Sequence, residues 1–389
     1  MISPFRDHHE AALRRIGDLE ATAADLRHQL DAARSAHPAP KPARASILVG
    51  VVVGILSVVA VARGVARPSV GGSPSPVPSS LRPEIENVSL IEPVDNYPFR
   101  AKRDLYGVWS DGQETLVIGA SGEVTSGHRP ISLLRDDAQW RVASVPTKQT
   151  LRAVAVGPSA VFAVGDRGTI LRRSRVSQQW EAEESGTTHD LLGIATHEGE
   201  LYAVGRGGTV LHRGAWSDTP WRAEESGTKE DLYGVAAGES SGVYAVGDRG
   251  TIVKRTSRRW LAVTSGTNTD LRGAAALGPD AFFVGKHGVI LHASSDDEHV
   301  VAEESGTRLD LTAIAVREPR PNVEGMVIAV GQRGTVRLRG LRSTRRWAKQ
   351  GVATEQDLLA VWAFPTVLVG AEGTVIAPSE FAGGAREPL

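Results

Sequence analysis

Residues 161–170 read VFAVGDRGTI and residues 243–252 read VYAVGDRGTI, so ten positions repeat with a single change. Each stretch has an apolar run ending in Val-Gly, followed by Asp-Arg-Gly-Thr and a second apolar residue. This order is typical of two antiparallel strands joined by a tight turn. We predict a type I turn at the Asp-Arg pair, with Gly168 and Gly250 in the positive φ that a bulge residue after such a turn requires.

The glycine pair of this hairpin recurs seven times, at intervals of 46, 40, 42, 38, 46 and 39 residues. The pairs are Gly119/Gly122, Gly165/Gly168, Gly205/Gly208, Gly247/Gly250, Gly285/Gly288, Gly331/Gly334 and Gly370/Gly373. A leucine, usually preceded by aspartate, recurs with them at Leu105, Leu151, Leu191, Leu232, Leu271, Leu311 and Leu358. Eleven residues before six of these leucines stand Trp140, Trp180, Trp221, Trp260, Val300 and Trp347. This constant spacing indicates that the segment from tryptophan to leucine has a fixed structure.

Each repeat divides into four strand-sized pieces, which in one copy are residues 191–195, 201–204, 209–212 and 221–225. Four antiparallel strands about every 40 residues, seven times over, predict an all-β, seven-bladed β-propeller of four-stranded blades over residues 85–380, with a tail at 381–389. A linear β-solenoid is the main alternative, although its repeats are usually shorter.

The last repeat ends after three strands, near residues 377–378, and has no tryptophan segment behind it. Val94 lies 11 residues before Leu105, which is the spacing that the tryptophans keep. We therefore expect residues 85–99 to supply the outer strand of the last blade and to close the ring. Pro93 and Pro98 are tolerated on an outermost strand.

The pattern Trp-x5-Gly-Thr-x3-Leu followed by Tyr-Ala-Val-Gly-Asp-x-Gly-Thr-Ile resembles the seven-bladed propellers of the photosystem II assembly and stability factor type, which are related to BNR-repeat propellers. The resemblance covers roughly residues 85–378 and rests on residues that build blades. It implies a non-enzymatic scaffold that docks onto other proteins, usually outside the cytoplasm. The Ser-x-Asp-x-Gly-x-Thr-Trp box of sialidase-like members is absent from residues 172–180.

Composition points the same way, because 42 glycines, 21 prolines and 20 aromatic residues among 389 are unlike a largely helical enzyme. The formal net charge of −1 supplies no general attraction to nucleic acid, which we exclude as a partner. With no cysteine, disulfides, thiolate metal sites and cysteine nucleophiles are all excluded.

Within residues 1–36, apolar residues recur at alternating spacings of four and three. The seam positions are Ile16, Leu19, Ala23, Leu26, Leu30 and Ala33. The pattern predicts an amphipathic helix, and about three heptads leave open a short dimeric coiled coil, a lone helix or a frayed end.

After a spacer at residues 37–44, residues 45–62 contain no charged residue. Eighteen residues at about 1.5 Å each reach about 27 Å, so we predict a transmembrane helix over 45–66 that contacts the lipid bilayer through 45–62. A cleaved signal peptide and a buried helix or strand are the alternatives. Ser46, Gly50 and Gly54 lie four apart, as in close-packed membrane helix dimers, and with the heptads they favour a homodimer.

Residues 67–84, rich in proline, serine and glycine, are expected to form an extended linker. Four basic residues precede the apolar segment and three follow it, so charge orients it only weakly. We expect a single-pass protein of the inner cell membrane, with its N-terminus in the cytoplasm and its propeller outside.

No catalytic residue, metal site or cofactor is predicted. The 11 histidines have no ligand spacing, the recurrent Ser-Gly-Thr indicates a turn, and the Glu-Glu pairs beginning at Glu183, Glu224 and Glu303 belong to the repeat. The favoured function is therefore a membrane-anchored protein-interaction or scaffold module. The alternative is a propeller hydrolase or lyase that acts on envelope glycan.

One candidate binding site remains. In a four-stranded blade, the turn between the second and third strands lies on the same face as the connection to the next blade. Arg167, Arg206, Arg249 and Arg333 should therefore share one face. They either form ion pairs with acids of neighbouring blades or make a basic arc that binds a protein partner.

Overall fold

The structure is a computed structural model and describes residues 103–376, except 112–113, 129–139, 158, 216–218, 258, 295–299, 322 and 342–345. Within this range no helix has the length and hydropathy needed to cross a membrane. The predicted N-terminal helix, spacer, membrane span, linker, closing strand at 85–99 and C-terminal tail all lie outside the described residues.

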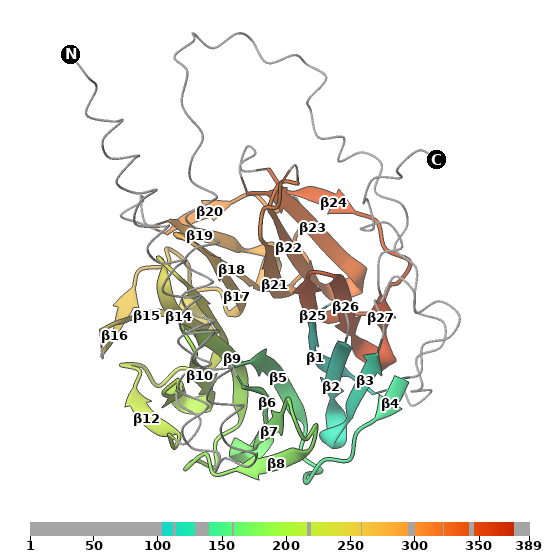
Figure 1. The fold of residues 1–389 in the computed structure, drawn as a ribbon. Helices are drawn as coiled ribbons and strands as arrows, with labels where there is room; N and C mark the ends of the chain where they lie inside the picture. The colour runs from blue at the N-terminus through green and yellow to red at the C-terminus, as the bar shows by residue number, and fades with distance from the viewer. Residues whose placement is uncertain are drawn as a thin grey trace, which may run out of the picture. The chain divides into compact units, whose positions relative to one another are not determined.

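The described residues form seven antiparallel sheets, six with four strands and one with three, and each sheet uses strands that are consecutive in the chain. The sheets surround a common centre as blades 1 to 7 (Figure 1). The first strand of blade 1 contacts the first two strands of blade 7, so the ends of the array meet. A linear solenoid is thereby ruled out, and the predicted seven-bladed propeller is confirmed.

Within each blade the strands run outward from the centre in chain order. The innermost strands are β1 (Leu105–Ser110), β5 (Leu151–Val156), β9 (Leu191–His197), β13 (Leu232–Gly238), β17 (Leu271–Leu277), β21 (Leu311–Arg317) and β25 (Leu358–Ala363). The second strands are β2 (Glu114–Gly119), β6 (Ala160–Gly165), β10 (Glu200–Gly205), β14 (Gly242–Gly247), β18 (Asp280–Gly285), β22 (Met326–Gly331) and β26 (Thr366–Gly370).

The third strands are β3 (Val124–His128), β7 (Ile170–Ser174), β11 (Thr209–Arg213), β15 (Ile252–Thr256), β19 (Ile290–Ser294), β23 (Thr335–Gly340) and β27 (Val375–Ile376). The outer strands are β4 (Trp140–Val142), β8 (Trp180–Glu183), β12 (Arg222–Glu225), β16 (Arg259–Val263), β20 (Val301–Glu303) and β24 (Ala348–Gln350). Blade 7 has three strands among the described residues.

Hydrophobic packing joins each blade to its neighbour. Side chains alternate between the two faces of a strand, so the second strands, which are buried almost throughout, contribute to the core on both sides. At the junction of blades 2 and 3, the Phe162 and Trp221 rings meet edge to face, with centroids 6.3 Å apart. Between inner strands the backbones come close, because a Cβ atom added to Gly234 would lie 3.0 Å from the Ala274 amide nitrogen.

Candidate functional site

The turns between second and third strands, together with the connections between blades, form one face of the propeller, here called the turn face. The seven turns are η3 (Ala120–Gly122), η5 (Asp166–Gly168), η6 (Arg206–Gly208), η7 (Asp248–Gly250), η8 (Lys286–Gly288), η9 (Gln332–Gly334) and η10 (Ala371–Gly373). The sequence-based placement of the four arginines on one face, together with the connections between blades, agrees with this arrangement.

The predicted type I turn at Asp-Arg is wrong. The Thr169 amide donates to the Asp166 carbonyl, so Arg167 and Gly168 are the two central residues of the turn. Both have positive φ, 55° at Arg167 and 69° at Gly168, which defines a type I′ turn. This turn matches the right-handed twist of the flanking strands, whereas a type I turn would splay them.

The turn geometry divides the four arginines into two groups. Arg167, Arg249 and Arg333 occupy the second turn position, in the left-handed region, whereas Arg206 occupies the first. In chain order the second position holds Ser121, Arg167, Gly207, Arg249, His287, Arg333 and Glu372. Sequence spacing alone treated Arg206 as equivalent to Arg167, which the structure corrects.

In six of the seven blades an aspartate precedes the inner-strand leucine and fixes the neighbouring turns. The Asp190 carboxylate accepts a hydrogen bond of 2.9 Å from the Arg167 amide of the preceding blade. The Asp190 carbonyl accepts another, of 3.0 Å, from the Arg206 amide of its own blade. Carboxylates in the same role are Asp231 for Gly207, Asp270 for Arg249, Asp310 for His287, Asp357 for Arg333 and Asp104 for Glu372. The last of these bonds joins blade 7 to blade 1, and Thr150 replaces the aspartate of blade 2.

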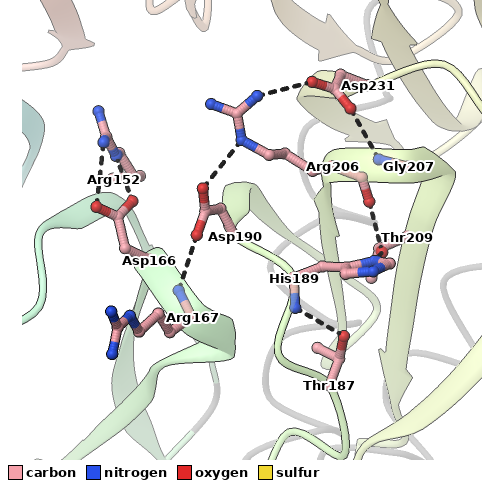
Figure 2. Close-up of polar contacts among 10 residues, drawn as sticks. All are labelled: Arg152, Asp166, Arg167, Thr187, His189, Asp190, Arg206, Gly207, Thr209 and Asp231. Atoms are coloured by element: carbon pink, nitrogen blue, oxygen red, sulfur yellow. Dashed lines mark hydrogen bonds and ion pairs between the residues drawn. The ribbon is translucent and has the colours of Figure 1, made fainter.

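Arg206 and Arg249 are both held by acids. The Arg206 guanidinium lies 2.9 Å from Asp190 and 3.0 Å from Asp231, so it bridges blades 3 and 4 (Figure 2). Arg249 lies 2.5 Å from Glu230, although three quarters of its side chain is exposed. The backbone N–H of Arg167 and then the Arg206 guanidinium hold the pKa of Asp190 below its usual value, against the opposing effect of burial.

Arg167 and Arg333 differ from these two. Both side chains are exposed, and among the described residues no carboxylate lies within ion-pair distance of either guanidinium. Figure 2 shows the Arg167 guanidinium pointing away from Asp166 and Asp190, whereas its amide is bonded to Asp190. The turn face therefore presents these two cations without an acidic partner in the described chain.

The repeated glutamates have a structural role that sequence reasoning only partly anticipated. Glu224 on β12 accepts hydrogen bonds from Nε and Nη2 of Arg255, at 3.0 and 2.9 Å, and from the Trp260 indole N–H at 2.8 Å. Arg255 and Trp260 belong to the next blade, so the trio joins blades 3 and 4. Burial alone would raise the pKa of Glu224, but the bonds from Arg255 and Trp260 outweigh it and lower the pKa.

Two more junctions carry this Glu–Arg–Trp network. Glu183 accepts bonds from Arg213 at 2.5 Å and Trp221 at 2.9 Å. Glu303 accepts a bond from Trp347 at 2.8 Å and lies 3.5 Å from Arg339. Trp221, Trp260 and Trp347 are thus interblade hydrogen-bond donors as well as core residues, whereas the indole N–H of Trp180 has no partner among the described residues.

A cavity of about 1000 Å³ runs along the inner strands at the centre of the ring. At its turn-face end the guanidinium of Arg152 lies 4.7 Å from the centre of the Tyr106 ring and bonds both oxygens of Asp166. On the other side of the cavity Arg272 stacks on Tyr233 at 3.9 Å and pairs with Asp270. These cations are therefore already bound by aromatic rings and carboxylates.

Among the described residues no three histidine, aspartate or glutamate side chains form a cluster that could hold a metal ion. His212 and His292 each lie between two carboxylates, but Arg and Trp donors of the next blade also bind Glu224 and Glu303.

The fold and its turn face define the class of this protein as a seven-bladed β-propeller. No known protein family matches the sequence, and no curated protein is similar enough in sequence to match. Solved propellers match by structure. The WD40 repeats of RRP9 have a TM-score of 0.60 at 12% identity, covering 74% of this chain and 97% of that one.

Two further solved structures show the same fold. YCF48 from Cyanidioschyzon merolae has a TM-score of 0.57 at 12% identity and covers 74% of this chain and 98% of its own. YCF48 bound to D1 peptide has a TM-score of 0.58 at 13% identity and covers 76% of this chain and 99% of that one. At these identities the similarity concerns the fold alone.

Proposed function

We propose that this protein is a non-enzymatic scaffold that binds a protein partner through the arginines of its turn face. The observation that carries the proposal is the exposure of Arg167 and Arg333 without a described acidic partner, each on a turn whose backbone is fixed by the next blade. Because the turn backbone is already fixed, only the arginine side chains lose conformational freedom on binding, which favours association with an acidic surface.

Arg249 and Arg206 add to this surface to different degrees. Arg249 is three quarters exposed and has one acidic partner, whereas Arg206 is held by two aspartates. An acidic partner should therefore bind Arg167, Arg249 and Arg333 more favourably than Arg206, whose charge is already paired. The structure of YCF48 with a D1 peptide supports a peptide or protein ligand for a propeller of this shape.

Residues 45–62 are proposed to anchor the protein in the inner membrane, with the cytoplasm on the N-terminal side and the propeller outside. The support is the uncharged 18-residue segment followed by a linker rich in proline, serine and glycine. Reporter fusions after Ser80 test the orientation. Activity of only the reporter that requires the cytoplasm would contradict the proposed orientation. A mature N-terminus near Arg63 would indicate that the segment is cleaved as a signal peptide.

The binding proposal is tested with a photo-crosslinking amino acid in place of Asp248, beside Arg249, in the full chain in native membranes, followed by mass spectrometry. Replacing Arg167, Arg249 and Arg333 together by Gln should abolish crosslinking to the partner, and raising the salt concentration should weaken it.

The matched control replaces Arg141, Arg222 and Arg259 by Gln, which removes the same charge from exposed positions of outer strands. This control should crosslink as the wild type does. Equal crosslinking by both triple variants would refute the turn-face proposal. If the turn-face variant unfolds, the arginines act in folding and the proposal is also wrong.

A further inference from the structure

The loops between the first and second strands of the blades lie on the face opposite the turn face, here called the loop face. They are residues 111–113, 157–159, 198–199, 239–241, 278–279, 318–325 and 364–365. The first five consist only of glycine, proline, serine, glutamine and acidic residues. The loops of blades 6 and 7 differ, because they contain the large apolar residues Val323 and Phe364.

Val323 and Phe364 belong to one surface patch, because Arg320 contacts both residues. These three residues are here called the loop patch. Arg320 and Val323 exchange two backbone hydrogen bonds, of 2.9 and 3.0 Å. The guanidinium carbon of Arg320 lies 3.5 Å from the centre of the Phe364 ring. The Trp362 indole N–H donates a hydrogen bond of 2.8 Å to the Phe364 carbonyl. The loop patch therefore joins blades 6 and 7 and has a fixed backbone.

Other exposed apolar side chains of the described residues stand alone. Val323 and Phe364 are 44% and 41% exposed. The other large apolar residues with such exposure are Val142, Val176 and Leu261, which lie one each on blades 1, 2 and 4. Single exposed apolar residues are common on protein surfaces, whereas neighbouring ones indicate a contact surface.

Net charge does not select the partner of the loop patch. The segment from the end of β21 to the start of β22 carries Arg317 and Arg320 but also Glu318 and Glu324, so its charges balance. An aromatic ring in contact with an aliphatic side chain and an arginine suits the membrane–water interface. There the ring lies at the level of the lipid headgroups, and a guanidinium on its long stem reaches the phosphates.

The direction of the outer strands favours a position of the linker near the loop patch. In blades 1 to 6 each outer strand begins at the loop face and ends at the turn face, where the connection to the next blade follows. The closing strand predicted at residues 85–99 has the same place in the repeat, so it should begin at the loop face of blade 7. The linker at residues 67–84 and the proposed membrane span come directly before it. A flexible linker of this length spans about 20–25 Å on average, which would keep the loop face close to the bilayer.

We propose that the loop patch contacts the lipid bilayer in which the chain is anchored. Phe364 and Val323 enter the interface between headgroups and acyl chains, and Arg320 binds a lipid phosphate. This inference rests on the proposed membrane anchor. It also directs the turn face away from the bilayer, where a protein partner can reach the arginines.

The test uses the full chain, which contains no cysteine, so that one introduced cysteine can carry a fluorescent label. Pro321→Cys places nitrobenzoxadiazole at an exposed position between Arg320 and Val323, and the chain is reconstituted into phosphatidylcholine vesicles. Glu372→Cys is the control, because Glu372 is exposed on the turn face of blade 7. Lipids with a spin label near the headgroup should quench the label at position 321 at least threefold more strongly than the label at position 372.

Substitutions within the loop patch test its side chains directly. Val323→Asp, made in the Pro321→Cys chain, adds a charge to the patch and should lower the quenching at least threefold. Val176→Asp is the matched control, because Val176 is 94% exposed on blade 2 and lies outside the patch. It should leave the quenching unchanged. Phe364→Asp makes the same test from blade 7 and keeps it decisive if Val323→Asp fails to fold.

The outcomes separate this inference from the proposed function. A chain that alkaline carbonate extracts from the vesicles would refute the membrane anchor and this inference with it. A chain that resists extraction, but is quenched equally at positions 321 and 372, would overturn the inference alone and leave the anchor standing. If the cysteine of Pro321→Cys is shielded from maleimide in native membranes but its label is not quenched in the protein-free vesicles, a protein covers the patch and the inference is wrong.

Discussion

Replacing Glu224 by Val should destabilise the propeller strongly. The equivalent residue of blade 4 is Val263, but there the positions of Arg255 and Trp260 are occupied by Ala293 and Val300 of blade 5, whereas the single variant keeps both Arg255 and Trp260. The substitution leaves the Arg255 guanidinium and the Trp260 indole N–H without their acceptor. Removing one partner of a buried ion pair costs about 3–5 kcal/mol. The side chains of Arg255 and Glu224 are 14% and 17% exposed, so we expect about 2–4 kcal/mol because water partly screens the pair.

The double variant Glu224→Val/Arg255→Ala reproduces the pair Val263 and Ala293 of the next junction. It also removes the unpartnered guanidinium, so its loss of stability should be smaller than the sum of the two single losses by about 1–3 kcal/mol. Urea unfolding followed by tryptophan fluorescence measures all three values, and a loss of 2–4 kcal/mol corresponds to a fall in melting temperature of about 4–16 °C.

Glu225→Val is the control, because Glu225 is the exposed neighbour of Glu224 on the same strand. Its effect should stay within about 0.5 kcal/mol, as expected for an exposed position. Additive losses, or a Glu224→Val variant as stable as Glu225→Val, would refute the claim that the Glu–Arg–Trp network joins the blades.

Four further outcomes are expected. The hydrogen bonds that lower the pKa of Asp190 stabilise the folded state above about pH 4, and this contribution is lost as the pH falls through the folded pKa. Asp190→Asn should therefore lose less stability to urea unfolding in acid than the wild type does. Burial raises the pKa of Glu123, whose carboxylate oxygens have no hydrogen-bond partner among the described residues. Ionisation of Glu123 therefore lowers the stability of the folded state at neutral pH. Glu123→Gln should raise the free energy of unfolding at pH 7 but not at pH 3. Arg167→Gly copies Gly207 in the left-handed turn position and should leave the melting temperature unchanged or higher, whereas a fall would show that the Arg167 side chain stabilises the fold. Deleting residues 85–99 should unfold or oligomerise the propeller, because the last blade would keep an open strand edge, and an unchanged melting temperature would contradict the closing strand.

The sequence predicted the number of blades and their strands because glycine, leucine and tryptophan recur at near-constant spacings. It misjudged the turns, since Asp-Arg-Gly fits a type I turn followed by a bulge as well as a type I′ turn. Gly207 in the third repeat was a usable signal, because a glycine at this position indicates positive φ.

The roles of Asp190 and Glu224 could not be predicted in the same way. Their partners lie in adjacent blades, 23 and 31 residues away in the chain, so the contacts depend on how blades pack. The sequence indicates this packing only at the junction of blades 4 and 5. There Val263, Ala293 and Val300 together replace the glutamate, arginine and tryptophan of the network. The joint change can be recognised only when the outer strand of one repeat is compared with the third and outer strands of the next repeat.

The turn capped by an aspartate of the following blade has a consequence for where the chain could be cut and rejoined. A break in the connection before Asp190 would detach that residue's carboxylate from the Arg167 turn, and the same loss would follow before every blade that has the aspartate. The connection before Thr150 has no such carboxylate to lose. A circular permutant opened there should therefore retain more of its parent's stability than one opened before Asp190.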